Sequence, residues 1–333
     1  MTHSIAIIGG GSWGTALSIV LAPRFERVRL WAYETDLVER MVATRINDIF
    51  LPGFLLPENV EPVSHLKGAL DEAAIVIGVV PSRFARSVYS SMLPHLEPGM
   101  RFVSATKGLE NGTLLRMSEV ARDVIGKKFD PRIAVLSGPT FAKEVARGEP
   151  TAVVIASQDQ ELAASIQREF SGPTFRLYAN DDPVGVELGA ALKNIIAIGA
   201  GICQGLGLGN NTLAALITRG LAEITRLAVA LGGRPKTLAG LAGLGDLVLT
   251  CTGELSRNRS VGVELAKGRE LDDIVSSMTM IAEGVETTSA AVDLARKSNV
   301  DMPITQQMDS ILRGSRSPRE AIRELMERTL KAE

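Results

Sequence analysis

Residues 4–14 read Ser-Ile-Ala-Ile-Ile-Gly-Gly-Gly-Ser-Trp-Gly, a short apolar run that leads directly into a cluster of glycines. Gly9, Gly11 and Gly14 match the pattern G-x-G-x-x-G, and a helical pattern follows. In a strand–turn–helix unit these glycines permit a tight turn, close approach of the backbone to a pyrophosphate, and close packing of helix against strand. The phosphates bind at the positive end of the helix. The stretch therefore predicts a dinucleotide-binding site, the alternative being a purely structural glycine turn.

The chain that follows this stretch alternates between strand and helix patterns up to about residue 180. Because several of the strand runs are continuously apolar, they are typical of strands covered on both faces, and their alternation with helices favours a doubly wound parallel sheet. We expect strands at Ser4–Ile8, Val28–Trp31, Ile75–Val80, Arg101–Ala105, Ile133–Leu136, Ala152–Ala156 and Phe175–Tyr178, with helices such as Thr15–Ala22, Leu114–Val124 and Gln160–Phe170 between them.

Beyond Pro183 the strand patterns stop and only helical patterns remain. Glycine-rich or Asn/Asp-rich breaks separate them. The expected helices are Val184–Gly201, Thr212–Leu231, Val261–Ala266, Thr287–Lys297, Ile304–Leu312 and Arg319–Leu330. The sequence therefore predicts an α/β protein with two domains: a dinucleotide-binding Rossmann domain over residues 1–182, and an all-helical, substrate-binding domain over residues 183–333.

Composition argues against several classes of protein. The 333 residues carry 36 basic and 38 acidic side chains, a balance that does not suggest a nucleic-acid partner. The charge-free stretch from Asn194 to Thr218 is interrupted by polar residues and glycines, so we expect no membrane span. Cys203 and Cys251 form no disulfide framework, and the three histidines lack metal-ligand spacing. We expect a cytoplasmic protein without a bound metal or a secretory signal.

The end of the second expected strand bears on the choice between NAD and NADP. Glu34 stands 20 residues after Gly14, where a carboxylate can accept a hydrogen bond from the adenosine ribose 2′-hydroxyl. No arginine, which a 2′-phosphate would favour, follows directly. NAD is therefore weakly preferred over NADP, although Glu34 as a solvated loop residue remains an alternative.

Ligands of open α/β sheets bind beyond the carboxyl ends of the strands. Three of the expected strands end in Pro81-Ser82, in Thr106-Lys107-Gly108, and in Ser137-Gly138-Pro139-Thr140. Lys107 is the cation among these exits, and we expect it to contact the ligand. The alternative is an exposed loop lysine.

Lys193 and Asn194 lie in the middle of an apolar helix pattern, Glu187–Gly201. The neighbours of Lys193 at helical spacing are Gly, Ala and Ile, whereas a solvated lysine usually has polar companions. Because burial disfavours the ammonium form, such a lysine is usable as a proton acceptor near neutral pH. The alternative is a lysine whose charged end reaches solvent over an apolar face.

A second distinctive stretch runs from Gly243 to Ser260. Asp246 lies at an expected glycine-flanked turn, placed to hydrogen-bond a lysine or a hydroxyl. Ser256, Arg257 and Asn258 precede a helix expected to begin near Val261, and an arginine with several donors at a helix N-terminus forms a phosphate site. Cys251 has no histidine beside it in sequence, so we interpret it as a packed residue.

Taken together, these motifs resemble the bacterial form of the NAD(P)-dependent glycerol-3-phosphate dehydrogenase family. The resemblance extends over roughly residues 4 to 325 and follows the family's order. It is carried by Gly9–Gly14, Ala105–Glu110, Ser137–Glu144, Leu192–Gly201, Ala242–Thr252 and Ser256–Arg259. It implies a Rossmann domain followed by a helical domain like that of 6-phosphogluconate dehydrogenase, in a homodimer that interconverts dihydroxyacetone phosphate and glycerol 3-phosphate for phospholipid synthesis.

The resemblance also implies roles for individual residues. Lys193 would be the general base, with Lys107 and Asp246 beside it in the catalytic group. Substrate-contacting positions would be Lys107, Gly138, Thr140, Lys193, Asn194, Asp246, Ser256, Arg257 and Asn258, and cofactor-contacting positions Ser12, Trp13, Tyr33, Lys107, Ala142, Arg257, Ile281 and Glu283. The sequence departs from the family at Tyr33-Glu34, where bacterial relatives often carry a basic residue.

Two other functions are compatible with parts of this pattern. A β-hydroxyacid or 6-phosphogluconate-type dehydrogenase would require a substrate carboxylate. A non-catalytic dinucleotide sensor would use the Rossmann domain as a switch, but would need neither a base nor a phosphate-binding arginine.

Overall fold

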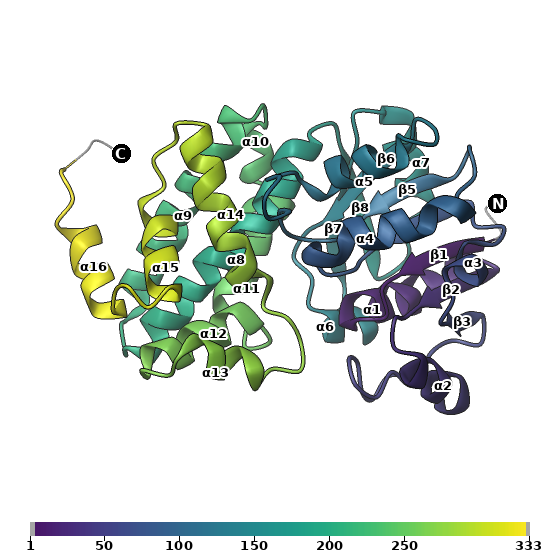
Figure 1. Ribbon diagram of the computed structural model, residues 1–333, viewed down its shortest axis with the longest axis horizontal. Helices are drawn as coiled ribbons and strands as arrows, with labels where there is room; N and C mark the ends of the chain where they lie inside the picture. The colour runs from purple at the N-terminus through teal and green to yellow at the C-terminus, as the bar shows by residue number, and fades with distance from the viewer. Residues whose placement is uncertain (1–3, 331–333) are drawn as a thin grey trace. The chain divides into compact units, whose positions relative to one another are not determined.

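The computed structural model describes residues 4–330, which fold into two compact units (Figure 1). One unit comprises the chain up to Lys107 together with Leu115–Glu187, and the other comprises Gly108–Leu114 and the chain from Leu188 onward. The division falls inside helix α8 (Pro183–Gly205). A domain boundary after residue 182, at the start of this helix, stays a prediction.

The first unit is built on an eight-stranded sheet in the order β3-β2-β1-β4-β5-β6-β7-β8. All neighbouring strands are parallel except β6 and β7, which are antiparallel. The strands are β1 (Ser4–Ile8), β2 (Arg27–Trp31), β3 (Val60–Val63), β4 (Ile75–Gly78), β5 (Arg101–Ser104), β6 (Arg132–Ser137), β7 (Thr151–Ala156) and β8 (Phe175–Asn180). The seven strands expected from the sequence are therefore confirmed, within a mostly parallel sheet.

Two features of the sheet were not expected. Strand β3 is short and carries Pro62, which an edge strand tolerates because one side of it needs no partner. Strand β7 is antiparallel to β6. The segment between them contains only the five-residue helix α6 (Ala142–Ala146), so β7 begins at the same edge of the sheet where β6 ends.

Alternate residues of β1 point into two separate hydrophobic cores. Ile5 and Ile7 belong to one core, and Ala6 and Ile8 to the other. The first core also takes side chains from α1 (Ser12–Leu21), α2 (Thr35–Thr44), α6 and α7 (Gln160–Phe170), and the second from α3 (Leu66–Leu70), α4 (Ser82–Met92) and α5 (Met117–Ile125). The sheet is thus covered on both faces, which confirms the doubly wound architecture.

From Leu188 onward, the regular secondary structure of the second unit is helical over the described residues (Figure 1). It contains the larger part of α8 and α9 (Asn210–Ala230), α10 (Pro235–Leu238), α11 (Asp246–Thr252), α12 (Arg257–Ala266), α13 (Leu271–Ser276), α14 (Glu283–Lys297), α15 (Pro303–Leu312) and α16 (Pro318–Met326). The six helices expected here are present with small shifts at their ends, whereas α10, α11 and α13 were not expected.

Helix α8 is long and apolar enough to cross a membrane by length and composition. Its most apolar 18-residue window, however, is 100% buried inside the protein. The helix is therefore a buried core helix and not a membrane span, which agrees with the interpretation of this stretch from the sequence.

Glycines allow α8 and α12 to pack in close contact. A Cβ at Gly201 would lie 1.9 Å from the carbonyl oxygen of Arg259, and a Cβ at Gly262 would lie 1.9 Å from that of Ile198. Any side chain at either position would force the helices apart. The close crossing places α12 directly beside the helix that carries Lys193.

Candidate functional site

The glycine-rich loop after β1 has the geometry that dinucleotide binding requires. Gly9 has φ +134°, and a Cβ on Gly14 would lie 1.9 Å from the carbonyl oxygen of Gly9, so neither position accepts a side chain. A Cβ on Gly11, in contrast, would meet nothing within 4 Å. The first and third glycines are thus required by the turn and by packing, and the second leaves open space where a pyrophosphate can approach.

Helix α1 begins beside this open space without a side-chain cap. Its N-cap is Gly11, so no side chain accepts from the first N–H groups of the helix, and these groups can donate to an anion. Ser12 and Trp13 form the first turn. The loop itself is held by Asn47, a buried residue that the sequence analysis missed because it belongs to no motif.

Tyr33 and Glu34 follow β2 and are both exposed. Glu34 is the N-cap residue of α2, but its side chain makes no capping hydrogen bond. The ring of Tyr33, 81% exposed, lies edge-on to that of Trp31 at a centroid distance of 6.5 Å. The Glu34 carboxylate is therefore not used to cap the helix and is exposed where a ligand can reach it.

Lys107 contacts two of the other residues expected at the strand exits. Its Nζ donates to the carbonyl oxygen of Gly138 at 3.2 Å and to Oγ1 of Thr140 at 3.4 Å. These residues meet because β5 and β6 are parallel neighbours, so their carboxyl ends share one edge of the sheet. Lys107 is partly buried, which contradicts the alternative of an exposed loop lysine. Ala142 begins α6 just beyond Thr140.

Lys193 and Asp246 form a buried ion pair in the second unit. Nζ of Lys193 lies 2.9 Å from Oδ1 of Asp246, and the two side chains are only 6% and 1% exposed. The same Nζ donates to Oγ1 of Thr250 at 2.6 Å, and that hydroxyl donates to the carbonyl oxygen of Asp246 at 2.6 Å. The charged end of Lys193 is therefore inside the protein, and the alternative in which it reaches solvent is wrong.

Close packing brings the two partners together. One turn before Lys193, a Cβ on Gly189 would lie 2.7 Å from the carbonyl oxygen of Ala242, so the residue must be glycine for the two segments to touch. Residues Leu241–Gly245 form a π-helical turn that leads directly into α11, of which Asp246 is the first residue. The prediction of a turn at Asp246 was thus wrong, because the preceding glycine-rich residues form a π-helix that continues into α11.

The start of α12 also differs from the expectation. The helix begins at Arg257 and not near Val261, because the Ser256 hydroxyl caps it by accepting from the backbone N–H of Arg259 at 3.3 Å. Arg257 is exposed in the first turn. A basic side chain beside the positive end of a helix is a favourable place for a phosphate.

The beginning of α14 lies against this site. Oδ1 of Asn258 accepts from the backbone N–H of Gly284 at 2.9 Å, and a Cβ on Gly284 would lie 2.8 Å from the carbonyl oxygen of Asn194. Glu283 directly precedes Gly284, and Ile281 lies two residues before Glu283. The structure thus gathers the candidate residues Asn194, Ser256, Arg257, Asn258, Ile281 and Glu283 around the N-termini of two helices.

Cys251 is fully buried in α11. Burial raises the pKa of its thiol to about 12, so the reactive thiolate is strongly disfavoured. This agrees with its interpretation as a packed residue.

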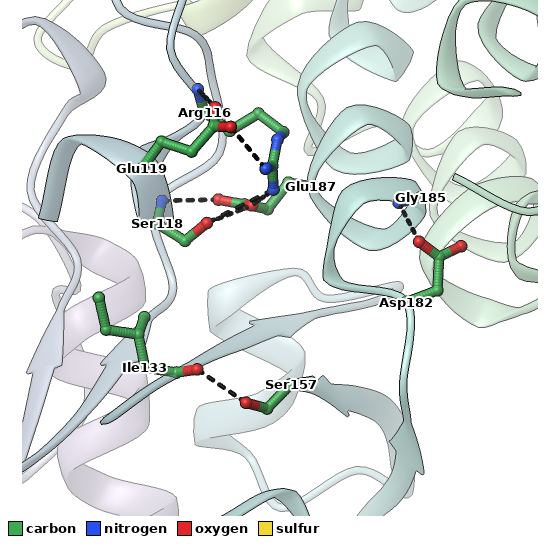
Figure 2. A network of polar contacts seen from close by, with 8 residues as sticks. All are labelled: Arg116, Ser118, Glu119, Ile133, Ser157, Asp182, Gly185 and Glu187. Carbon is green, nitrogen blue, oxygen red and sulfur yellow. Dashed lines mark hydrogen bonds and ion pairs between the residues drawn. The ribbon is translucent and has the colours of Figure 1, made fainter. Parts of the chain in front are cut away.

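Near its start, α8 carries a buried carboxylate with a different role (Figure 2). Glu187 accepts from the backbone N–H of Ser118 at 2.8 Å and pairs with Arg116 at 2.5 Å, and both partners lie at the N-terminus of α5. Burial raises the pKa of Glu187, against the opposing effects of Arg116 and Ser118. Glu187 therefore caps α5, and its hydrogen-bond and ion-pair partners among residues 4–330, Arg116 and Ser118, are not candidate site residues.

Comparisons with known proteins identify relatives along nearly the whole chain. Residues 4–163 match the family model for the NAD-dependent glycerol-3-phosphate dehydrogenase N-terminus, and residues 182–323 match the model for its C-terminus. A glycerol-3-phosphate dehydrogenase [NAD(P)+] from Koribacter versatilis is 60% identical over 326 residues, with 97% of each chain covered. One from Geobacter sulfurreducens is 51% identical over 337 residues, with 100% of this chain and 99% of the relative covered.

A solved structure agrees with these matches. The glycerol-3-phosphate dehydrogenase from Coxiella burnetii superposes with a TM-score of 0.93 at 43% identity, covering 98% of this chain and 99% of that one. Both family models, the curated relatives and this structure point to one family, and the chain belongs to the NAD-dependent glycerol-3-phosphate dehydrogenases.

Proposed function

We propose that the protein is an NAD(P)-dependent glycerol-3-phosphate dehydrogenase, which interconverts dihydroxyacetone phosphate and glycerol 3-phosphate. Family membership supports the overall reaction, and the buried Lys193–Asp246 pair is the observation that carries the chemistry. A lysine kept out of water beside a carboxylate is suited to hold and release a proton at a defined position.

Lys193 is the acid and base of this reaction. The nicotinamide ring supplies or accepts a hydride when the cofactor is bound. As the C2 oxygen of dihydroxyacetone phosphate gains negative charge, the ammonium of Lys193 stabilises it and then donates its proton. In the reverse direction the neutral amine takes the proton from the C2 hydroxyl. Asp246 favours the ammonium form through its charge, and Thr250 fixes the position of Nζ.

The phosphate of the substrate is held at the N-terminus of α12. Arg257 provides a guanidinium fork, Ser256 and Asn258 lie on either side of it, and the helix end adds its partial positive charge. In the helical unit, Asn194, beside Gly284, provides a further contact to the substrate. In the unit with the sheet, the Lys107–Gly138–Thr140 group is the candidate substrate contact. Binding energy from the non-reacting phosphate thereby orients the reacting carbon.

The cofactor binds at the glycine-rich loop, which fits a dinucleotide because Gly11 leaves room for the pyrophosphate. Within the unit with the sheet, its further candidate contacts are Ser12 and Trp13 at the start of α1, Tyr33 beyond β2 and Ala142 at the start of α6. Within the helical unit, Arg257, Ile281 and Glu283 are the candidate cofactor-contacting residues. Exposed Glu34 accepts from the ribose 2′-hydroxyl and makes NAD the weakly preferred cofactor over NADP.

Further properties belong to the same proposal. The enzyme works in the cytoplasm as a homodimer, without a metal, and supplies glycerol 3-phosphate for phospholipid synthesis. Neither a membrane nor a nucleic acid is a partner. A non-catalytic dinucleotide sensor is disfavoured, since it has no use for the buried Lys193–Asp246 pair.

The test is the initial rate of NADH oxidation by purified protein with dihydroxyacetone phosphate, measured beside NADPH and beside unphosphorylated dihydroxyacetone. We expect fast oxidation that depends on the phosphate, and a higher rate with NADH than with NADPH at low cofactor concentration. Cofactor binding without turnover would favour a sensor, and turnover of hydroxy acids alone would favour a related dehydrogenase. Comparable rates with low NADPH would overturn the role of Glu34.

A further inference from the structure

We propose that Asn47 is a positioning residue for the cofactor: it holds the glycine-rich loop in the conformation that receives the pyrophosphate, and thereby sets the affinity for the dinucleotide. The inference rests on the proposed function, because it assumes that this loop binds NAD or NADP. Asn47 lies in the segment between α2 and β3, well separated in sequence from the loop it contacts.

Every polar atom of the Asn47 side chain is used in these contacts. Nδ2 donates to the carbonyl oxygen of Gly10 at 2.8 Å and to Oγ1 of Thr15 at 2.8 Å, while Oδ1 accepts from the backbone N–H of Phe50 at 2.9 Å. Thr15 in turn donates its hydroxyl hydrogen to the carbonyl oxygen of Gly11 at 2.9 Å. Asn47 and Thr15 are both 0% exposed, so water does not compete for these bonds.

The direction of these bonds determines where the loop's N–H groups point. In a trans peptide the C=O of one residue and the N–H of the next point in opposite directions, and the described chain contains no cis peptide. Asn47 draws the Gly10 carbonyl toward the interior, and Thr15 does the same to that of Gly11. The N–H groups of Gly11 and Ser12 are therefore directed away from Asn47 and Thr15.

The composition of the glycine-rich loop explains why hydrogen bonds from Asn47 are needed to fix its conformation. Gly9, Gly10 and Gly11 are consecutive, and glycine loses more backbone freedom on ordering than any other residue. If the loop is already ordered before the dinucleotide binds, the binding free energy does not include the entropic cost of ordering it. Asn47 donates a hydrogen bond to this loop from outside the β1–α1 unit.

The decisive variant is Asn47→Asp, which has nearly the same shape and still accepts from Phe50, but replaces the donating amide with a second acceptor facing the Gly10 carbonyl. We expect the KM for NADH and the Kd of ADP-ribose, which contains the pyrophosphate, to rise about tenfold, equivalent to about 1.4 kcal/mol. The turnover number at saturating NADH and the KM for dihydroxyacetone phosphate should change far less. If Asn47 had only a structural role, Asn47→Asp would lower the amount of folded enzyme, but the KM for NADH would not rise selectively.

The matched control is Asn59→Asp. Asn59 lies in the same inter-element segment and also donates twice to backbone, to the carbonyl oxygens of Ala22 and Phe25 at 2.9 Å each, but at the opposite end of α1. We expect Asn59→Asp to lower the unfolding midpoint while leaving the KM for NADH unchanged. A rise in KM for NADH as large as that of Asn47→Asp would overturn the inference.

The inference and the proposed function fail in different ways. Wild-type protein that neither binds nor oxidises NADH would overturn the proposed function. Active wild-type protein together with a wild-type KM for NADH in Asn47→Asp would overturn only the role of Asn47. If Asn47→Asp does not fold, the same measurements on Thr15→Val decide, since valine removes the hydroxyl that joins Asn47 to Gly11. An unchanged KM for NADH in that variant would again contradict the inference.

Discussion

The Lys193–Asp246 pair contributes both to stability and to turnover, and the two contributions can be measured separately. Removing one member of a buried ion pair leaves the other charge without compensation, which costs about 3–5 kcal/mol. We therefore expect Lys193→Met to lower the free energy of unfolding by about this amount and the turnover number by orders of magnitude. Denaturant unfolding and steady-state rates with dihydroxyacetone phosphate measure the two effects separately.

A double variant separates these effects. Lys193→Met combined with Asp246→Leu removes both buried charges, and replacement of such a pair by apolar side chains is often neutral for stability. Stability should then largely return while turnover stays lost. Near-normal turnover in either variant would rule out Lys193 as the acid and base.

Arg257 is exposed, so its truncation should change stability little. Because hydrogen bonds to charged groups contribute about 1.5–3 kcal/mol, Arg257→Ala should raise the KM for dihydroxyacetone phosphate by about 10- to 100-fold. The KM for NADH should rise much less. The slow reduction of unphosphorylated dihydroxyacetone serves as the control, since it cannot use the guanidinium. Equal losses for substrate and cofactor would contradict a phosphate-binding role.

For individual residues, the sequence predicts a role in the site where the residue belongs to a recognisable local pattern. Lys107, Gly138 and Thr140 were expected together because each follows a parallel strand, and Lys193 stood out by its apolar neighbours. Asn47 and Thr250 were not predicted, because their roles depend on hydrogen bonds between segments far apart in sequence, where no local pattern exists.

Among the helices, two buried glutamates act as caps for helices other than their own. Glu187 of α8 caps α5, and Glu223 of α9 caps α15 by accepting from the backbone N–H groups of Ile304 at 2.7 Å and Thr305 at 3.2 Å. Both carboxyl groups lie among the first N–H groups of the helix they cap, so hydrogen bonds as well as packing tie one helix to another.

The cap at α15 makes stability depend on pH. Burial raises the pKa of Glu223 from its ordinary value of 4.5 to about 7, although the backbone hydrogen bonds oppose the shift. The folded protein therefore binds this proton more tightly than the unfolded chain, and the resulting stability is lost as pH rises from about 4.5 to 7. We expect the contribution to reach up to about 3 kcal/mol, measured as unfolding free energy against pH.

The control for this dependence is Glu223→Gln, which cannot titrate but still offers one acceptor oxygen to the N-terminus of α15. Subtracting its pH profile from that of wild-type protein isolates the glutamate, because the other titrating groups are common to both. Parallel profiles between pH 4.5 and 7 would show that Glu223 does not titrate in this window.

Element boundaries were predicted less well than element types. Strand β3 was missed because Glu61 and Pro62 break its apolar pattern, and α11 was missed because the glycines before it resemble a turn. The start of α12 was placed too late, since Ser256 is an N-cap that apolar periodicity does not reveal.

At the scale of the whole molecule, the two tryptophans of the chain offer a selective probe. Trp13 and Trp31 both lie in the unit with the sheet, so tryptophan fluorescence follows the unfolding of that unit alone. Because NAD binds the folded loop in our proposal, its presence at about 100 times Kd should add about 2.7 kcal/mol to the stability of this unit. The fluorescence-detected midpoint should rise accordingly.

Unphosphorylated dihydroxyacetone at the same concentration is the control ligand, for which no such rise is expected. A midpoint that saturating NAD leaves in place would contradict cofactor binding by the unit with the sheet.

The fold class was predictable because two signals agree over long stretches: strands alternate with helices up to residue 180, and only helices follow. The antiparallel β6–β7 pair was not predictable, since strand direction depends on the path of the connection and not on the residues of the strand.

Helix α8 has a consequence for recombination between relatives of this enzyme. Near its start the helix carries Glu187, the cap of α5 in one unit, while Lys193 farther along belongs to the other. A crossover placed before Pro183 would combine an α5 from one parent with its capping carboxylate from another. Chimaeras joined between Glu187 and Leu188 would keep each cap with its helix, so viable hybrids should have their breakpoints inside this helix rather than in the loop that precedes it.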